Sequence, residues 1–427
     1  MLYFRPGLGG LAPIPASEVA IRQVRSNTLR DVAIVGSGMT PCRSRWVEKT
    51  FWELAQMAVS EAVHDAGIHI RDVEAGVAGI YNDIFEFQAI PESGLQGIIG
   101  LQNKPLMRVT NGGATGAYAM LAAYNMVASG QHDLLLVLGV EKALDCYDFE
   151  AESNTPAVVQ TIGYSWDPWF ERPLGAHASE SYAEVIQAYM DEHPGDLAPM
   201  ARAQIVELLC EQAQNNPYAQ RRGEKVTADQ VLHSRYVVYP VRVLETCVYT
   251  EGACALIFAS SEMALKIKER NGREPIWLTG VGAANEPYFV GNDITRYKVL
   301  HRIYSDHVAT QKALQMAGIT IEDVRVIELH DAFIPQLMIT LAEMGVVPLG
   351  RANDLVEEGI ILPGGKVLVN PSGGLVFGGH FVGGSNMMST WSAMREMKAR
   401  NLEHGLIHGT GASLSMYGVA MVLERRA

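Results

Sequence analysis

The sequence lacks the features that mark several common functional classes. Its formal net charge is −13 and no long basic run offsets it, which argues against general binding to nucleic acid or to a membrane surface. No apolar stretch approaches the roughly 18 residues that cross a bilayer, and residues 1–15 lack the basic-then-apolar order of a secretory signal. We therefore expect a cytoplasmic protein with no nucleic-acid partner and no membrane insertion.

Cysteine is scarce and follows no pattern. No two of the five cysteines form a CxxC pair, so the sequence predicts reduced thiols and no metal site. They are Cys42, Cys146, Cys210, Cys247 and Cys254.

The chain is long and rich in hydrophobic residues and glycine. Its 427 residues are 48% hydrophobic and only 19% charged, with 41 glycines. This composition is typical of an α/β protein with a large core and many tight turns. Residues 1–28 are expected to form an extended arm that lies on a neighbouring surface or on a second subunit.

An internal repeat is the most informative feature. Residues 62–75 (AVHDAGIHIRDVEA) and 313–326 (ALQMAGITIEDVRV) are identical at seven of fourteen positions. Each copy has the pattern of a helix that ends at a glycine, Gly67 or Gly318, and is followed by a strand. This indicates a duplicated fold.

The plan of the two halves also agrees downstream. Residues 111–139 and 373–411 each run from a glycine-rich turn through a helix to an apolar strand. We therefore predict an N-terminal half at 29–285 and a C-terminal half at 286–427. An inserted cap at about 146–243 interrupts the first half, and it either determines substrate specificity or stabilises a dimer.

Six motifs then occur in a consistent order along the chain. Together they resemble the thiolase family, specifically its sterol-carrier-protein type. The resemblance implies a five-layered αβαβα sandwich, commonly dimeric, that acts on acyl-CoA thioesters with coenzyme A as a substrate and no permanently bound cofactor. The motifs are TNGGATG (110–116), VASGQHDLLLVLGVEKALD (127–145), ETCVYTEGACALIFAS (245–260), ELHDAF (328–333), NPSGGLVFGGHFVGGS (370–385) and GLIHGTGAS (405–413).

The nucleophile of the resembled family is missing. Gly113 stands where thiolases carry the cysteine that opens a buried helix and takes the acyl group. Its backbone N–H at a helix N-terminus is still suited to bind a thioester oxyanion. The alternative is that the glycines of this turn serve only close helix–sheet packing.

Two histidines carry the remaining chemistry that the resemblance implies. His380 matches the histidine that donates to the thioester oxygen or activates the nucleophile. Phe381 replaces the proline that usually follows it. His330, with Asp331, ends an apolar strand and matches the histidine that completes the oxyanion site. Structural roles for these residues remain open.

The second thiolase cysteine is also absent, because no cysteine follows Cys254. Thr410 or Ala412 stands in its place, and the N–H of Gly411 is a candidate for a second oxyanion hole. His408 and Tyr417 are candidate replacement bases.

Further site residues are weaker candidates. Cys247 is either a displaced nucleophile or a small apolar wall residue. The cap aromatics Tyr164, Trp166, Trp169 and Phe170 suit either a bulky acyl group or an interface. Candidates for contact with the CoA phosphates and chain, or else a solvated loop, are Arg221, Arg222, Lys225 and Ser372.

Three functions fit these residues. The first is a thiolase in which free CoA attacks the β-keto carbon directly. The second is a retro-aldolase acting on a β-hydroxyacyl-CoA, and the third is a non-catalytic acyl-CoA-binding subunit. Retention of His330 and His380 favours an enzyme over a non-catalytic subunit. It also favours the thiolase over the retro-aldolase, because this pair of histidines belongs to thiolases. By analogy with two-subunit relatives, the resemblance also implies a small zinc-ribbon/OB-fold partner.

Overall fold

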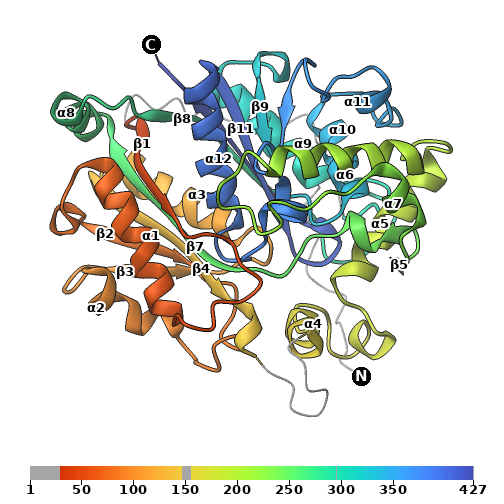
Figure 1. Ribbon diagram of the computed structural model, residues 1–427, viewed down its shortest axis with the longest axis horizontal. Helices are drawn as coiled ribbons and strands as arrows, with labels where there is room; N and C mark the ends of the chain where they lie inside the picture. Colours follow the sequence, from red (N-terminus) through yellow and green to blue (C-terminus); the bar gives the residue numbers. More distant parts are fainter. Residues whose placement is uncertain (1–28, 147–154, 295, 427) are drawn as a thin grey trace, which may run out of the picture.

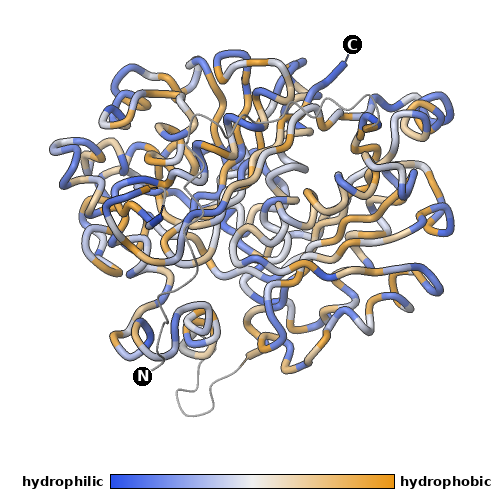
Figure 2. The backbone as a smooth tube through the Cα atoms, turned by 180° about the vertical axis from the view of Figure 1, so that it is seen from behind, coloured by the Kyte–Doolittle hydropathy of each residue, from blue (hydrophilic) through white to orange (hydrophobic). Residues whose placement is uncertain are grey.

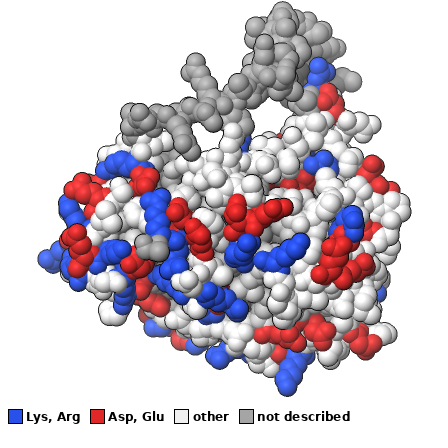
Figure 3. All heavy atoms as spheres, turned by 90° about the horizontal axis from the view of Figure 1, so that it is seen from above, with Lys and Arg blue, Asp and Glu red and all other residues white. Residues whose placement is uncertain are grey.

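The computed structural model describes residues 29–146, 155–294 and 296–426. The expected N-terminal arm at 1–28 lies outside the described residues. Among the described helices, none combines the length and hydrophobicity that a bilayer crossing requires. Acidic and basic side chains are interspersed on the face shown in Figure 3.

The ten strands of the large sheet fall into two halves with the same order. The first half runs β3-β2-β4-β7-β1 and the second β10-β9-β11-β12-β8, with β1 paired antiparallel to β8 between them. The sense of each pairing, parallel or antiparallel, also agrees position by position. The strands are β1 (Val32–Met39), β2 (Ala75–Gly79), β3 (Leu106–Val109), β4 (Leu134–Lys142), β7 (Glu251–Ser260), β8 (Ile276–Asn285), β9 (Val326–Glu328), β10 (Leu368–Val369), β11 (His404–Gly411) and β12 (Tyr417–Glu424).

Helices cover both faces of each half (Figure 1). Helices α3 and α12 pack on each other between the two half-sheets, α1, α2 and α8 lie on the first half, and α9 and α10 lie on the second. This gives five layers, αβαβα, and confirms the expected fold. The helices are α1 (Phe51–Ala66), α2 (Leu95–Ile99), α3 (Thr115–Ala128), α8 (Ser261–Asn271), α9 (Tyr304–Ala317), α10 (Ile334–Met344), α11 (Asp354–Glu357) and α12 (Ser385–Arg400).

The repeated sequence segments form the same local structure. Helices α1 and α9 end at Gly67 and Gly318, whose φ angles of 63° and 74° are left-handed and suit glycine. A short 3₁₀ turn follows each helix, at Ile70–Asp72 and Ile321–Asp323. The strands that come next, β2 and β9, are buried along their whole length. Most of the central strands are orange to white in the hydropathy colouring of Figure 2. The sequence prediction for this repeat is confirmed.

The inserted segment packs on the second half of the fold. Although it interrupts the first half in sequence, its helices α5 and α6 share a hydrophobic core with the second half. All eleven residues of α10 are buried, and α9, α5 and α6 all pack against this helix. The segment contains α4 (Thr155–Gly163), α5 (Ala178–Glu192), α6 (Pro199–Ala213), α7 (Ala228–His233), β5 (Tyr236–Val238) and β6 (Val241–Arg242).

Candidate active site

The side chains of His330 and His380 lie together. Their ring centroids are 5.1 Å apart and the rings meet edge to face, at 84°. His330 comes two residues after β9, and His380 follows the π-helical turn Gly374–Gly378. Two segments of the second half therefore bring both predicted histidines to one place.

The surroundings of His380 fix which ring nitrogen carries the proton. Its Nδ1 lies 2.7 Å from Ser385 Oγ, and that hydroxyl donates its own proton to the carbonyl of Phe381 at 3.0 Å. The hydroxyl oxygen therefore accepts from Nδ1–H, which leaves a lone pair on Nε2. Burial lowers the pKa of His380 to about 4, so the imidazole is neutral near pH 7. A neutral ring with a free Nε2 is suited to accept a proton.

His330 is more deeply enclosed and only 3% exposed. Burial lowers its pKa well below the usual value, and the neighbouring His380 and His408 act in the same direction. The main-chain carbonyl of His330 accepts a hydrogen bond from Gln336 Nε2 at 2.9 Å. A neutral imidazole held in this way is available to share a proton with a substrate oxygen.

Gly113 lies directly against this imidazole. A Cβ added to Gly113 would lie 2.8 Å from Cε1 and 3.0 Å from Nε2 of His330, and 2.7 Å from the carbonyl oxygen of Thr410. On the other side, a Cβ on Gly411 would lie 2.6 Å and 2.7 Å from the nitrogens of Gly113 and Ala114. The start of α3 and the end of β11 therefore meet beside His330, and the main-chain nitrogens of Gly113 and Ala114 lie between them.

The loop after β11 has an unusual backbone. Ala412, Leu414 and Ser415 have φ angles of 66°, 56° and 57°, which non-glycine residues rarely adopt. Hydrogen bonds hold this loop in place: Leu414 N–H donates to Ser181 Oγ at 2.9 Å, and Ser305 Oγ donates to the carbonyl of Ser415 at 3.1 Å. Strain that is held by the surroundings is typical of functional loops.

Comparison with known proteins identifies the family of the chain. A family model for the N-terminal domain of thiolase matches residues 32–160, and one for a thiolase C-terminal domain-like region matches residues 293–425. An acetyl-CoA acetyltransferase of Methanocaldococcus jannaschii is 31% identical over 399 residues, 91% of this chain and 96% of that protein. The chain belongs to the thiolase superfamily. Within it, the chain groups with the sterol-carrier-protein-2-like branch: chicken sterol carrier protein 2 is 29% identical over 91% of this chain and 72% of that protein.

Solved structures carry the same fold. An Ltp2-ChsH2(DUF35) aldolase superposes with a TM-score of 0.75 at 20% identity, over 93% of this chain and 98% of that chain. A monomeric SCP2-thiolase-like protein from Mycobacterium smegmatis gives a TM-score of 0.69 at 19% identity, over 93% of this chain and 78% of that chain. At these identities the likeness establishes the architecture only.

In this thiolase-superfamily chain, Cys247 is not activated. Burial raises the pKa of its thiol to about 12, and the nearby carboxyl of Asp331 acts in the same direction. A thiol with such a pKa is protonated at neutral pH and is a weak nucleophile. Its main-chain N–H donates to the carbonyl of Ala332 at 2.9 Å, beside the histidine segment. The structure favours the wall role for Cys247 over the nucleophile role.

Asp331 holds the glycine turn that precedes His380. Its Oδ1 accepts from the N–H of Leu375 at 2.7 Å, and its Oδ2 lies in the place that a side chain on Gly374 would need. The carboxyl is fully buried, and burial raises its pKa well above the usual value. The placement indicates a positioning role.

The candidate replacement bases are engaged elsewhere. Nε2 of His408 lies 2.9 Å from Oδ1 of Asp306, and both side chains are fully buried. The ring of Tyr417 packs edge to face on Tyr118. Both residues expected near the place of the second cysteine border the glycine turn: a Cβ on Gly112 would lie 3.0 Å from the nitrogen of Ala412, and one on Gly113 would lie 2.7 Å from the carbonyl oxygen of Thr410.

The four residues predicted to contact CoA differ in their exposure and in their contacts. The Ser372 hydroxyl is buried and donates to Glu328 Oε2 at 2.8 Å, which does not favour contact with CoA. Arg221 packs on the ring of Phe377 at 4.3 Å and pairs with Glu224. Arg222 and Lys225 are exposed on the same loop. These two remain available to phosphates.

The cap aromatics do not form one pocket wall. Trp166 is 5% exposed and donates to Ser181 Oγ at 3.2 Å, the hydroxyl that also holds the strained loop. Trp169 and Phe170 are 80% and 79% exposed, and Tyr164 is also exposed. Only Trp166 is placed to support the site.

The sequence reasoning missed the role of Glu141. This buried carboxylate at the end of β4 accepts from the N–H of Tyr81 at 2.9 Å and from the N–H of Gly383 at 3.0 Å. It thereby ties the His380 turn to the first half. Burial raises its pKa to about 8. Glu141 stands in the motif at 127–145, but the sequence did not show its contact with Gly383, 242 residues away.

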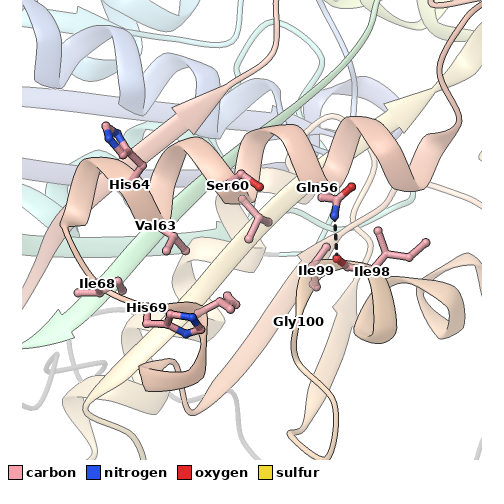
Figure 4. A pocket seen from close by; sticks show the side chains of 11 residues that line it. Gln56, Ser60, Val63, His64, Ile68, His69, Ile98, Ile99 and Gly100 are labelled. Atoms are coloured by element: carbon pink, nitrogen blue, oxygen red, sulfur yellow. Dashed lines mark hydrogen bonds between the residues drawn. The ribbon is translucent and has the colours of Figure 1, made fainter.

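A hollow elsewhere on the surface is separate from these residues. It measures about 440 Å³ and is lined by α1 together with segments 68–70 and 98–100 (Figure 4). None of the predicted site residues lines it.

Proposed function

We propose that this chain cleaves or forms the Cα–Cβ bond of a β-ketoacyl-CoA by acyl transfer to free CoA, without an acyl-enzyme. The observation that carries the proposal is the edge-to-face pair of His330 and His380 beside Gly113. The relatives named as acetyl-CoA acetyltransferases support acyl transfer. In this scheme CoA is a substrate and no permanently bound cofactor is needed.

The cleavage step balances with the groups present. His380 Nε2 accepts the thiol proton of CoA, and the thiolate attacks the β-keto carbon. The Cα–Cβ bond then breaks, and its electron pair forms the enolate of the departing acyl-CoA, which main-chain N–H groups at Gly113 and Gly411 and the imidazole of His330 stabilise. The proton on His380 returns to Cα. The β-keto acyl group ends as a shortened acyl-CoA on the incoming CoA. The enolate fragment, once protonated, ends as the second CoA thioester.

The low pKa of His380 is compatible with this role. Negative charge that develops on the bound substrate raises the pKa of a neighbouring imidazole. Proton transfer to His380 and formation of the enolate therefore support each other.

Retro-aldol cleavage of a β-hydroxyacyl-CoA is a second candidate. It is favoured by the position of His330, whose imidazole borders the place of the usual sulfur. From there a neutral ring is suited to take the proton of a β-hydroxyl group. The Cα–Cβ bond then breaks to give a carbonyl compound and the same enolate, and no second CoA is needed.

Partners of the relatives guide the wider proposal. The aldolase structure contains a DUF35 component beside the thiolase-like chain. We propose that this chain forms a homodimer and that the homodimer binds a small zinc-ribbon/OB-fold subunit. We also propose that the complex acts in the cytoplasm. A benzoylsuccinyl-CoA thiolase subunit of Thauera aromatica is 27% identical over 69% of this chain, which supports a bulky or aromatic acyl group.

The test supplies matched substrates to the purified chain, alone and with the product of a neighbouring gene. Aliphatic and aromatic β-ketoacyl-CoA with free CoA test the first candidate, and the corresponding β-hydroxyacyl-CoA without CoA tests the second. CoA-dependent formation of two thioesters supports acyl transfer. An aldehyde or ketone formed without CoA supports the retro-aldol reaction instead, and tight CoA binding with no turnover would reject both.

A further inference from the structure

A buried polar layer lies behind the histidine site and has no role in the proposed reaction. It is formed by side chains from α9, α10 and β11, and it lies beside the outer hydrophobic core of the second half. At its centre are His408 on β11 and Asp306 on α9, 2.9 Å apart and both fully buried. Removing two such side chains from water costs free energy that their contacts in the protein must offset.

Continuous contacts lead from this pair to His330. Asp306 Oδ2 accepts from Thr340 Oγ1 at 2.9 Å, and Thr340 Oγ1 accepts from Gln336 Nε2 at 3.3 Å. The same Gln336 amide donates to the carbonyl of His330 at 2.9 Å. His408 is therefore connected to the main chain of His330 through two helices.

The sheet itself does not hold the two site segments together. The ladder between β9 and β11 ends with the pair Glu328 and Ile407. His330 and Gly411 both lie beyond this last pair. Beyond this last pair, the polar contacts through Asp306, Thr340 and Gln336 link the two segments in place of strand pairing.

Several buried polar atoms of this layer have no hydrogen-bond partner among the described residues. Each belongs to a side chain that is at most 3% exposed. Internal water usually satisfies such groups. The atoms are Asp306 Oδ1, Thr310 Oγ1, His330 Nδ1, Gln336 Oε1, both ring nitrogens of His408 and Thr410 Oγ1. The 2.9 Å contact between His408 Nε2 and Asp306 Oδ1 is therefore a close polar contact without hydrogen-bond geometry.

We propose that His408 and Asp306 are positioning residues that set the separation and orientation of His330 and Gly411. The inference rests on the proposed function, because it assigns the pair to the same oxyanion site. His408 is three residues before Gly411 on the same strand, and Asp306 reaches His330 through Thr340 and Gln336. A change in the pair therefore moves both sides of the site.

The test uses Asp306→Asn, which keeps the shape and the acceptor for Thr340, and His408→Gln as a second variant. We expect kcat to fall about 10- to 100-fold, because small misplacements of catalytic groups have effects of this size, while KM stays within about twofold. Thr390→Val is the control: its hydroxyl donates to the carbonyl of Asn386 in its own helix and lies 3.3 Å from Met120 Sδ, so it takes no part in the contacts between Asp306 and His330. A kcat within about twofold of wild type for both folded variants would overturn the proposal.

A second readout does not depend on turnover. In ¹⁵N-histidine-labelled resting protein, the ring-nitrogen signals of His330 should shift in Asp306→Asn and remain unchanged in Thr390→Val. Unchanged His330 signals in both pair variants would overturn the inference. If the wild-type protein turns over none of the thioesters, the proposed function fails, and this spectroscopic result decides the positioning role by itself.

Discussion

The imidazole of His330 borders the space in which a side chain on Gly113 would begin. The separation between a Cβ at Gly113 and Cε1 of His330 would be 2.8 Å, which is shorter than real carbon contacts. In this chain a side chain at position 113 and the ring of His330 would therefore compete for the same space.

Restoring the cysteine should not restore an ordinary thiolase. Gly113→Cys forces the ring of His330 or the carbonyl of Thr410 to move, which we expect to lower kcat/KM at least 10-fold and to destabilise the fold by about 1–3 kcal/mol. Steady-state kinetics and denaturant unfolding measure both effects. Gly97→Ala is the matched control, because a Cβ at Gly97 meets nothing within 4 Å. A variant at Gly113 with higher activity would contradict this packing argument.

Removal of the His380 ring should cost most of the activity. His380→Ala is expected to lower kcat/KM by about 100-fold or more, because a group that interacts with developing charge is lost. Ser385→Ala should have a smaller effect, since it keeps the imidazole and removes the acceptor for Nδ1–H together with the hydrogen bond to the carbonyl of Phe381. Ser389→Ala, one turn further along α12, serves as control. Equal, small effects of all three substitutions would return His380 to a structural role.

The pH dependence of activity should reflect the low pKa of His380. A base is active when neutral, and this ring stays neutral down to about pH 4 instead of 6.5. The acid limb of kcat/KM is therefore expected near pH 4, with no His380 inflection between pH 6 and 7. Rates measured over this range in wild type, within the pH limits of folding, provide the test. An inflection at 6.5 that disappears in His380→Gln would contradict the assignment.

Glu141 should make the protein less stable as the pH rises. Its pKa in the folded state is raised from 4.5 to about 8, so the folded chain keeps a proton that the unfolded chain has released. This contribution to stability is complete below pH 4.5 and is lost as the pH rises to about 8. Glu141→Gln should reduce the loss of unfolding free energy between pH 5 and 8. An identical pH slope in the variant would show that Glu141 does not titrate in this way.

Much of the framework could be predicted because its signals are local. Gly67 and Gly318 end equivalent helices, and the repeat around them predicts two equivalent halves. His330 and His380 stand in recognisable motifs, so their meeting in one site follows from the fold. These inferences need only the chain within a few residues of each position.

Other features depend on contacts that sequence does not encode locally. The apolar faces of α5 and α6 predict burial, but not that α10 of the second half covers them. The contact between Asp306 and His408 joins residues on different elements of the second half. The exposure of Trp169 likewise depends on packing, since an aromatic residue in a loop suits a pocket or a surface equally.

In the proposed mechanism the site polarises a CoA thioester, and no cysteine sulfur of the protein forms a bond to the acyl group. The most direct measurement is intact-protein mass spectrometry of the enzyme quenched during turnover of a β-ketoacyl-CoA, beside the variant Cys247→Ala. We predict no acyl adduct at any cysteine and a kcat within about twofold of wild type for Cys247→Ala, because the raised pKa keeps that thiol protonated. An acyl group on Cys247, formed and lost at the rate of turnover, would contradict the account.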